Sequence, residues 1–165
     1  MARFLAFILG VAGALIASQG PGFTLQYMQN LQGRVDQLQA IVENHDQEIA
    51  KYGYTRDAAI VECRSATDLL EAMCANYRTA VERYEYLTGH LAELEATTDY
   101  VRPLVLARSY DRDVALSVRK QFEPAVPATI HGAIYAAGGF VVAWGLPLMI
   151  FSIIGAIFSG GRRYA

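Results

Sequence analysis

The sequence lacks several motifs that are typical of common enzyme classes. It contains no HExxH zinc motif, no GxSxG nucleophile turn, no phosphate-binding P-loop and no GxGxxG turn after a strand. The histidines His45, His90 and His131 lie more than 40 residues apart in sequence, a spacing that does not favour a shared metal site. We therefore predict that the protein is not an enzyme, and the sequence predicts no catalytic, cofactor-binding or metal-binding residue.

Charge is absent from two long stretches of the chain. Residues 4–17 and residues 132–161 contain no Asp, Glu, Lys or Arg, whereas all sixteen acidic residues lie between Asp36 and Glu123. Charge-free ends around a charged middle predict two membrane helices that flank a water-facing domain, with the lipid bilayer as a partner. The middle is acidic overall, which argues against nucleic-acid binding because phosphate contacts need a basic surface.

The hydropathy pattern divides the chain into four parts. We predict a transmembrane helix at residues 1–20, an extracytoplasmic helical domain at 21–128, a second transmembrane helix at 129–160 and a short basic cytoplasmic tail at 161–165. Basic residues beside membrane spans favour the cytoplasm, and the outer ends of the two spans carry Arg3, Arg162 and Arg163. Both termini are thus expected in the cytoplasm of a bacterial inner membrane, and the middle domain in the periplasm.

The first apolar stretch also fits a second interpretation. Its short basic start and its small residues are typical of a secretory signal peptide, and Ala12-Gly13-Ala14 offers a cleavage site of the A-x-A kind. We expect the stretch to be retained as a membrane anchor.

Small residues recur in both apolar stretches at helical spacing. In lipid such residues let two helix backbones approach closely, although Ala and Gly are common in any membrane helix. The spacing predicts that the two membrane helices pack together, and we expect Gly138 to take part as well. The predicted packing interface consists of Ala6, Gly10, Ala14, Gly132, Ala136, Gly139 and Ala143.

The middle of the chain carries two heptad patterns. Apolar residues spaced alternately three and four apart predict one long helix that ends near Gly53 and a second that runs from Asp68 to Ala96, with Thr55 and Thr67 as N-caps of a short and a long helix. Two shorter helices are expected near residues 98–109 and 111–121. The predicted seam of the hairpin consists of Met28, Leu31, Val35, Leu38, Val42 and His45 on one helix and of Leu70, Tyr77, Tyr84 and Leu91 on the other.

The expected fold class is therefore all-α, with two transmembrane helices flanking a periplasmic, coiled-coil-like antiparallel hairpin and short accessory helices. Within the seam, His45 is interpreted as a polar residue that fixes the register of the hairpin, with a pH-sensitive or metal-binding role as the alternative.

Cys63 and Cys74 are the only cysteines. On one continuous helix their Cα atoms would lie ~16 Å apart by rise, too far for a disulfide. They can bond only if the chain turns back between Ser65 and Asp68. The sequence leaves these two possibilities open.

The stretch SQGPGFTLQY, residues 18–27, stands between the first apolar stretch and the first heptad helix. We expect Pro21 and Gly22 to break the helix there, and Phe23 and Tyr27 to lie in the aromatic belt of the membrane interface. The segments SQGPGFTLQYMQNLQGRVDQL and FEPAVPATIHGAIYAAGGFVVAWG resemble a family of small bacterial two-pass membrane proteins known as domain of unknown function 2937. The resemblance implies the two-pass topology and carries no activity.

These features together predict a non-enzymatic inner-membrane scaffold that self-assembles into a homo-oligomer through its membrane helices and its helical outer domain. The alternative is an accessory or assembly subunit of a larger respiratory, photosynthetic or transport complex. In that case the same surfaces would bind another membrane protein.

Overall fold

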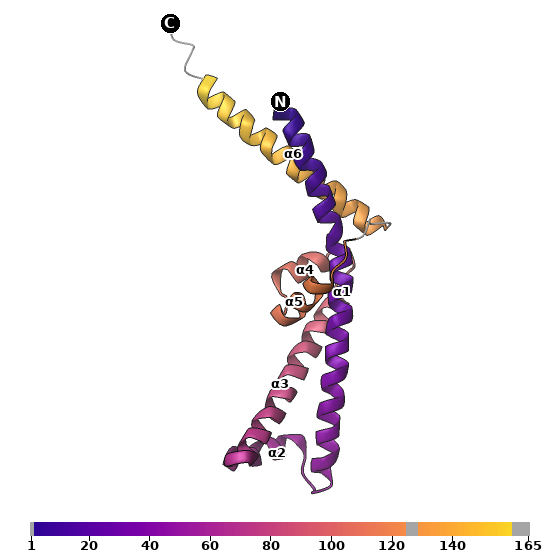
Figure 1. The fold of residues 1–165 in the computed structure, drawn as a ribbon, viewed down its shortest axis with the longest axis vertical. Helices are drawn as coiled ribbons and strands as arrows, with labels where there is room; N and C mark the ends of the chain where they lie inside the picture. The colour runs from indigo at the N-terminus through magenta and orange to yellow at the C-terminus, as the bar shows by residue number, and fades with distance from the viewer. Residues whose placement is uncertain (1, 125–128, 160–165) are drawn as a thin grey trace. The chain divides into compact units, whose positions relative to one another are not determined.

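The computed structural model describes residues 2–124 and 129–159, and within this part of the chain every regular element is helical (Figure 1). The all-α class predicted from the sequence is thus confirmed. The elements are α1 (Ala2–Ala50), α2 (Arg56–Glu62), the 3-10 helix η1 (Cys63–Ser65), α3 (Asp68–Ala96), α4 (Arg102–Arg108), α5 (Arg112–Gln121) and α6 (Ile130–Ser159).

Two of these helices are long and apolar enough to cross a membrane, judged by length and composition. They are the stretch Arg3–Ala50 of α1, through its N-terminal part, and the stretch Ile130–Ile154 of α6. The first candidate span contains the charge-free stretch 4–17, and the second overlaps the charge-free stretch 132–161.

The chain divides into two compact units. Unit 1 consists of Met1–Gln26, Asp99–Ser109 and Arg119–Ala165, and unit 2 consists of Tyr27–Thr98 and Tyr110–Val118. Unit 1 contains the apolar N-terminal part of α1 together with α6, and unit 2 contains the paired heptad segments.

The expected helix break at Pro21 and Gly22 is wrong, because α1 continues through both residues. An internal proline removes one helical hydrogen bond, here the bond to the carbonyl of Ala17. Membrane helices tolerate this loss because nearby side chains and neighbouring helices satisfy the freed backbone groups. In the same turns the hydroxyl of Thr24 donates to the carbonyl of Gly20 at 2.8 Å, and the hydroxyl of Ser18 donates to the carbonyl of Leu15 at 2.8 Å.

The other helix boundaries follow local capping chemistry. Gly53 has φ +79°, a left-handed conformation that favours glycine, and it lies three residues after the end of α1. The N–H of Ala58 donates to the hydroxyl of Thr55 at 3.3 Å, which confirms the predicted N-cap of α2. Helix α3 begins directly after Thr67, although the side chain of Thr67 makes no capping hydrogen bond.

Candidate functional site: the helix contacts and two polar junctions

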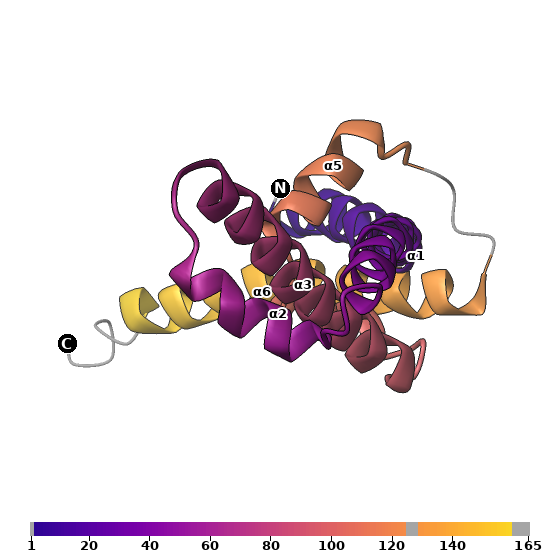
Figure 2. The ribbon, with the colours of Figure 1, turned by 90° about the horizontal axis from the view of Figure 1, so that it is seen from below.

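Within unit 2, α1 and α3 lie side by side and run in opposite directions (Figures 1 and 2). Tyr27 near the start of this segment of α1 contacts His90 near the end of α3, whereas Asp46 contacts Tyr77, which lies earlier in α3. Ile60 of α2 packs against the buried cluster between the two helices. That cluster consists of Val42, Tyr77 and Val81.

At one end of this pairing lies the Tyr27 junction, which we define as Tyr27, Arg83, His90 and Asp111. The backbone N–H of Asp111 donates to the hydroxyl of Tyr27 at 2.8 Å. Tyr27 can therefore direct its own proton to Nε2 of His90, which lies 2.9 Å away. In this arrangement the ring proton of His90 is on Nδ1, on the side of the Glu93 carboxylate at 3.9 Å.

Asp111 ties the start of α5 to this junction. Its carboxylate accepts the backbone N–H of Val114 at 3.0 Å, which caps α5, and it pairs with the guanidinium of Arg83 at 2.7 Å. Burial alone would raise the pKa of Asp111. The Arg83 hydrogen bond and the N–H groups at the helix start outweigh that effect and hold the pKa below its usual range. Burial raises the pKa of the Tyr27 hydroxyl to about 12.

Further along the pairing lies the Asp46 junction, which we define as His45, Asp46, Arg56 and Tyr77. The Asp46 carboxylate accepts hydrogen bonds from the guanidinium of Arg56, with Nε at 3.2 Å, and from the hydroxyl of Tyr77 at 2.7 Å. The hydrogen bond from Arg56 is the main reason that the pKa of Asp46 is lowered. Burial and the bond to Asp46 raise the pKa of Tyr77 to about 12. This junction joins α1, α2 and α3.

The structure places the predicted seam residues unequally. Most of them are buried or half-buried between α1 and α3. The ring of His45 is exposed instead and stacks on Tyr77 with ring centroids 5.1 Å apart. Leu70 is also exposed. Leu31, Val35, Val42, Tyr77 and Leu91 are buried, and Met28, Leu38 and Tyr84 are half-buried.

Sequence reasoning missed the two residues that make the central polar contact. Tyr27 is fully buried in unit 2, so its expected place in a membrane aromatic belt is wrong. His90 is also buried, and no pattern in the sequence assigns it a role. Helical spacing could have indicated their burial, because residues four apart lie on the same face of a helix. Tyr27 lies four residues before the buried Leu31, and His90 lies four residues before the buried Leu94.

The two cysteines form a disulfide, with their Cα atoms 5.6 Å apart. The chain turns back between them, since η1 ends at Ser65 and α3 starts at Asp68, where φ is +57°. Of the two possibilities that the sequence left open, the structure therefore has the one in which the chain turns back and the cysteines bond.

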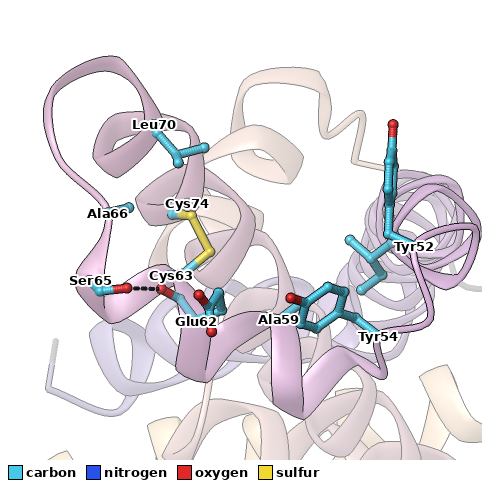
Figure 3. Close-up of a pocket in the computed structure, with 10 residues that line it drawn as sticks. Tyr52, Tyr54, Ala59, Glu62, Cys63, Ser65, Ala66, Leu70 and Cys74 are labelled. Carbon is cyan, nitrogen blue, oxygen red and sulfur yellow. Dashed lines mark hydrogen bonds between the residues drawn. A yellow bond between two sulfur atoms is a disulfide. The ribbon is translucent and has the colours of Figure 1, made fainter.

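Beside the disulfide lies a hollow of about 330 Å³ (Figure 3). The disulfide and Leu70 lie on one side of the hollow, and Tyr52 and Tyr54 on the other. Its lining is completed by Ile49, Ala59, Glu62, Ser65 and Ala66.

Within unit 1, α1 and α6 cross at glycines. A Cβ atom added at Gly13 would lie 2.4 Å from Cβ of Ala143, and one added at Gly139 would lie 2.5 Å from Cβ of Ala17. At Gly10 it would lie 2.9 Å from the ring of Phe140. Real Cβ atoms do not approach other atoms this closely, so the backbones are as near as they are because these residues are glycines.

The predicted packing residues are distributed as follows. The contact contains Gly10, Gly139 and Ala143 from the predicted set, together with Gly13 and Ala17, which sequence reasoning missed. Gly138 is wrongly predicted, because nothing lies within 4 Å of a Cβ placed there. Ala6 and Gly132 are buried, and Ala14 and Ala136 are half-buried.

Among the residues that the structure describes, no group of three or more His, Cys, Asp and Glu side chains is arranged to hold a metal ion. The described residues form an all-α protein with two candidate membrane helices, a pair of long helices in unit 2 and a disulfide that joins η1 to α3. The chain belongs to the family described as Protein of unknown function (DUF2937), whose model matches residues 1–160. The family resemblance noted in the sequence is thereby confirmed. No match was found among the curated proteins or among the solved structures.

Proposed function

We propose that this protein is a non-enzymatic scaffold of the bacterial inner membrane that assembles with copies of itself. The observation that carries the proposal is the exposure of α6. None of its most apolar stretch is buried within the chain, although the stretch is long enough to span a bilayer. Such a helix requires lipid or another membrane helix around it, and α1 covers only the face that carries Gly139.

Unit 2 has a second surface that calls for a partner. Large apolar side chains are exposed at the end of the hairpin where the disulfide lies, and exposed apolar patches of this kind mark interaction sites in water-facing domains. We call this surface the tip patch, and it consists of Tyr52, Val61, Leu69, Leu70 and Met73. In the proposed assembly the tip patches of neighbouring copies cover one another.

The disulfide supports the proposed orientation. Disulfides form and persist outside the reducing cytoplasm, which favours a periplasmic location for unit 2 and a cytoplasmic location for both termini. The basic residues are weaker evidence for the orientation. Arg119 and Lys120 lie before α6 within the range of roughly 15–20 residues that influences topology, and they oppose the influence of Arg162 and Arg163 after it.

A second function is favoured by the hollow beside the disulfide. Its volume of about 330 Å³ offers space for apolar side chains of a different protein, as expected for an accessory or assembly subunit of a larger membrane complex. Affinity purification from native membranes distinguishes the two functions. One stoichiometric foreign partner would favour the accessory subunit, and recovery of this chain alone would favour the scaffold.

Native mass spectrometry of the full chain in mild detergent tests the scaffold. We expect an oligomer, and a monomer that persists at micromolar concentration would contradict the proposal. Replacing Leu69 and Met73 together by Gln should shift the population toward smaller species. Glu71→Gln is the matched control, because Glu71 is exposed on the same turn of α3 and adds nothing apolar to the patch.

A further inference from the structure

Charge is distributed unequally between the two units. Unit 1 contains seven Lys and Arg residues but only two acidic residues, a net charge of +5. Unit 2 contains seven Lys and Arg residues and fourteen acidic residues, a net charge of −7. The unit with the candidate spans is therefore cationic in a protein that is acidic overall.

Four of the cations of unit 1 lie in the short segments that precede α6. We call them the basic collar, which consists of Arg102, Arg108, Arg119 and Lys120. Arg102 pairs with Asp99 at 2.7 Å. Among the described residues no carboxylate lies within ion-pair distance of the other three, and all three are exposed.

Contacts within unit 1 place this collar where the apolar part of α1 ends. Pro103, next to Arg102, lies 3.8 Å from a Cβ placed on Gly20. Phe122, two residues after Lys120, packs edge-on against Phe23 with ring centroids 5.5 Å apart. Gly20 and Phe23 are three residues apart on α1, or about 4.5 Å along the helix axis. The two ends of the collar therefore meet α1 within one turn of each other.

The first turns of α6 lie at the same level. The hydroxyl of Tyr135 donates to the carbonyl of Tyr100 at 2.6 Å, and the ring of Tyr100 lies 4.3 Å from that of His131. Tyr100 lies two residues before Arg102, the first residue of α4. Tyrosine residues collect at the depth of lipid headgroups, so Tyr100 and Tyr135 mark a membrane interface at the start of α6, beside the basic collar.

We propose that the basic collar binds the phosphate groups of anionic phospholipids in the leaflet from which α1 and α6 emerge. The inference rests on the membrane location proposed above and adds a lipid class to it. Cations beside an anionic membrane surface attract its headgroups, and exposed ones do so without giving up an existing ion pair. Interfacial aromatic residues hold these cations at the required depth.

The single tryptophan of the chain supplies the measurement. Trp144 lies in α6 and is 41% exposed, so lipids with brominated acyl chains quench its fluorescence when they contact the protein. The full chain is reconstituted in bilayers that contain brominated phosphatidylglycerol or brominated phosphatidylcholine in competition with the unbrominated lipids. The ratio of the two quenching curves gives the relative affinity for the anionic lipid.

We expect the parent protein to prefer phosphatidylglycerol and the preference to weaken in high salt. Each cation removed should lower the relative affinity about fivefold, so that Arg119→Gln with Lys120→Gln lowers it at least tenfold. Arg78→Gln is the matched control, because Arg78 is exposed in unit 2. Equal quenching of the parent by both lipids would overturn the lipid proposal alone. Absence of quenching by either lipid would instead overturn the membrane location.

Two further outcomes would overturn the lipid assignment. If glycerol phosphate in solution abolishes the preference, the ligand is a soluble phosphate. If the Arg119→Gln, Lys120→Gln variant keeps its lipid preference but loses its oligomeric state in native mass spectrometry, the collar binds the acidic unit 2 of another copy.

Discussion

The hydroxyl group of Tyr27 lies 2.9 Å from Nε2 of His90, a residue 63 positions further along the chain. The same hydroxyl accepts the backbone N–H of Asp111. One phenol oxygen therefore connects α1, α3 and the start of α5 at one end of the helix pairing. This contact is the natural place to test how the hairpin is held together.

Replacing Tyr27 by Phe should destabilise the protein by about 1 to 3 kcal/mol. The change leaves the N–H of Asp111 and Nε2 of His90 without their partner in a buried site, and unpaired buried polar groups cost this much. Denaturant unfolding in mild detergent, followed by far-ultraviolet circular dichroism, measures the loss. Tyr52→Phe is the matched control, because Tyr52 is 79% exposed. Equal unfolding midpoints for the two variants would contradict the role of the junction.

Acid should weaken unit 2 through Asp46 and Asp111. Both carboxyl groups have a pKa in the folded protein that lies below the ordinary value of about 3.9, so the stability they contribute is present above about pH 3.9. It is lost as the pH falls through the lower folded pKa values. Unfolding measured in steps between about pH 6 and pH 2 should show this decline.

Asp111→Asn should flatten that decline and lower the stability at neutral pH, since the variant cannot pair as an anion with Arg83. Asp36→Asn is the control, because Asp36 is exposed and bonds only to the amide of Gln32 among the described side chains. An Asp111→Asn variant with the acid profile of the parent would show that Asp111 contributes nothing to the pH dependence.

The disulfide should make the hairpin sensitive to reductants. Closing the chain between Cys63 and Cys74 restricts the unfolded state, and native disulfides typically contribute about 2 to 4 kcal/mol. Dithiothreitol should therefore lower the unfolding midpoint of the parent and leave the Cys63→Ser, Cys74→Ser double variant unchanged. In cells, the thiols should resist alkylation until a reductant is added. Free thiols in untreated membranes would argue against the proposed periplasmic location of unit 2.

Leucine at position 139 and leucine at position 138 should have opposite outcomes. A side chain at Gly139 collides with Ala17 and the backbone of Gly13, whereas a side chain at Gly138 meets nothing within 4 Å. Gly139→Leu should therefore separate α1 from α6 and lower the melting temperature in detergent, while Gly138→Leu should melt like the parent. Emission from Trp144, which lies beside Gly10, should shift in the first variant only. Identical behaviour of both variants would contradict the described contact.

The regular parts of this fold could be predicted from the sequence because their causes are local. Heptad spacing indicated the long helices of the hairpin, and Thr55 and Gly53 marked helix ends by their own backbone chemistry. The course of the chain at Pro21 could not be predicted in the same way. A proline breaks a helix in water, but α1 is a candidate membrane span, where the neighbouring helix changes the outcome.

The candidate site was less predictable because it depends on contacts between distant segments. The spacing of small residues predicted that Gly10, Gly138 and Gly139 lie on helices. It did not predict which of the adjacent residues Gly138 and Gly139 faces the other helix, and only Gly139 does. Tyr27 and His90 are amphipathic side chains, and the buried hydroxyl of Tyr27 has a partner in Asp111, far along the chain. No local pattern reports such a partner, so the polar junction appears only in the folded structure.

Pro21 also has a mechanical consequence for α1. A helix resists stretching and bending through its ladder of hydrogen bonds, and in α1 that ladder lacks the rung at Ala17. The hydroxyl groups of Ser18 and Thr24 donate hydrogen bonds to backbone carbonyls in the adjoining turns. Such side-chain bonds favour bending of a helix. A force that bends the N-terminal end of α1 will therefore deform the helix first around residues 17–24, before it affects the Tyr27 junction.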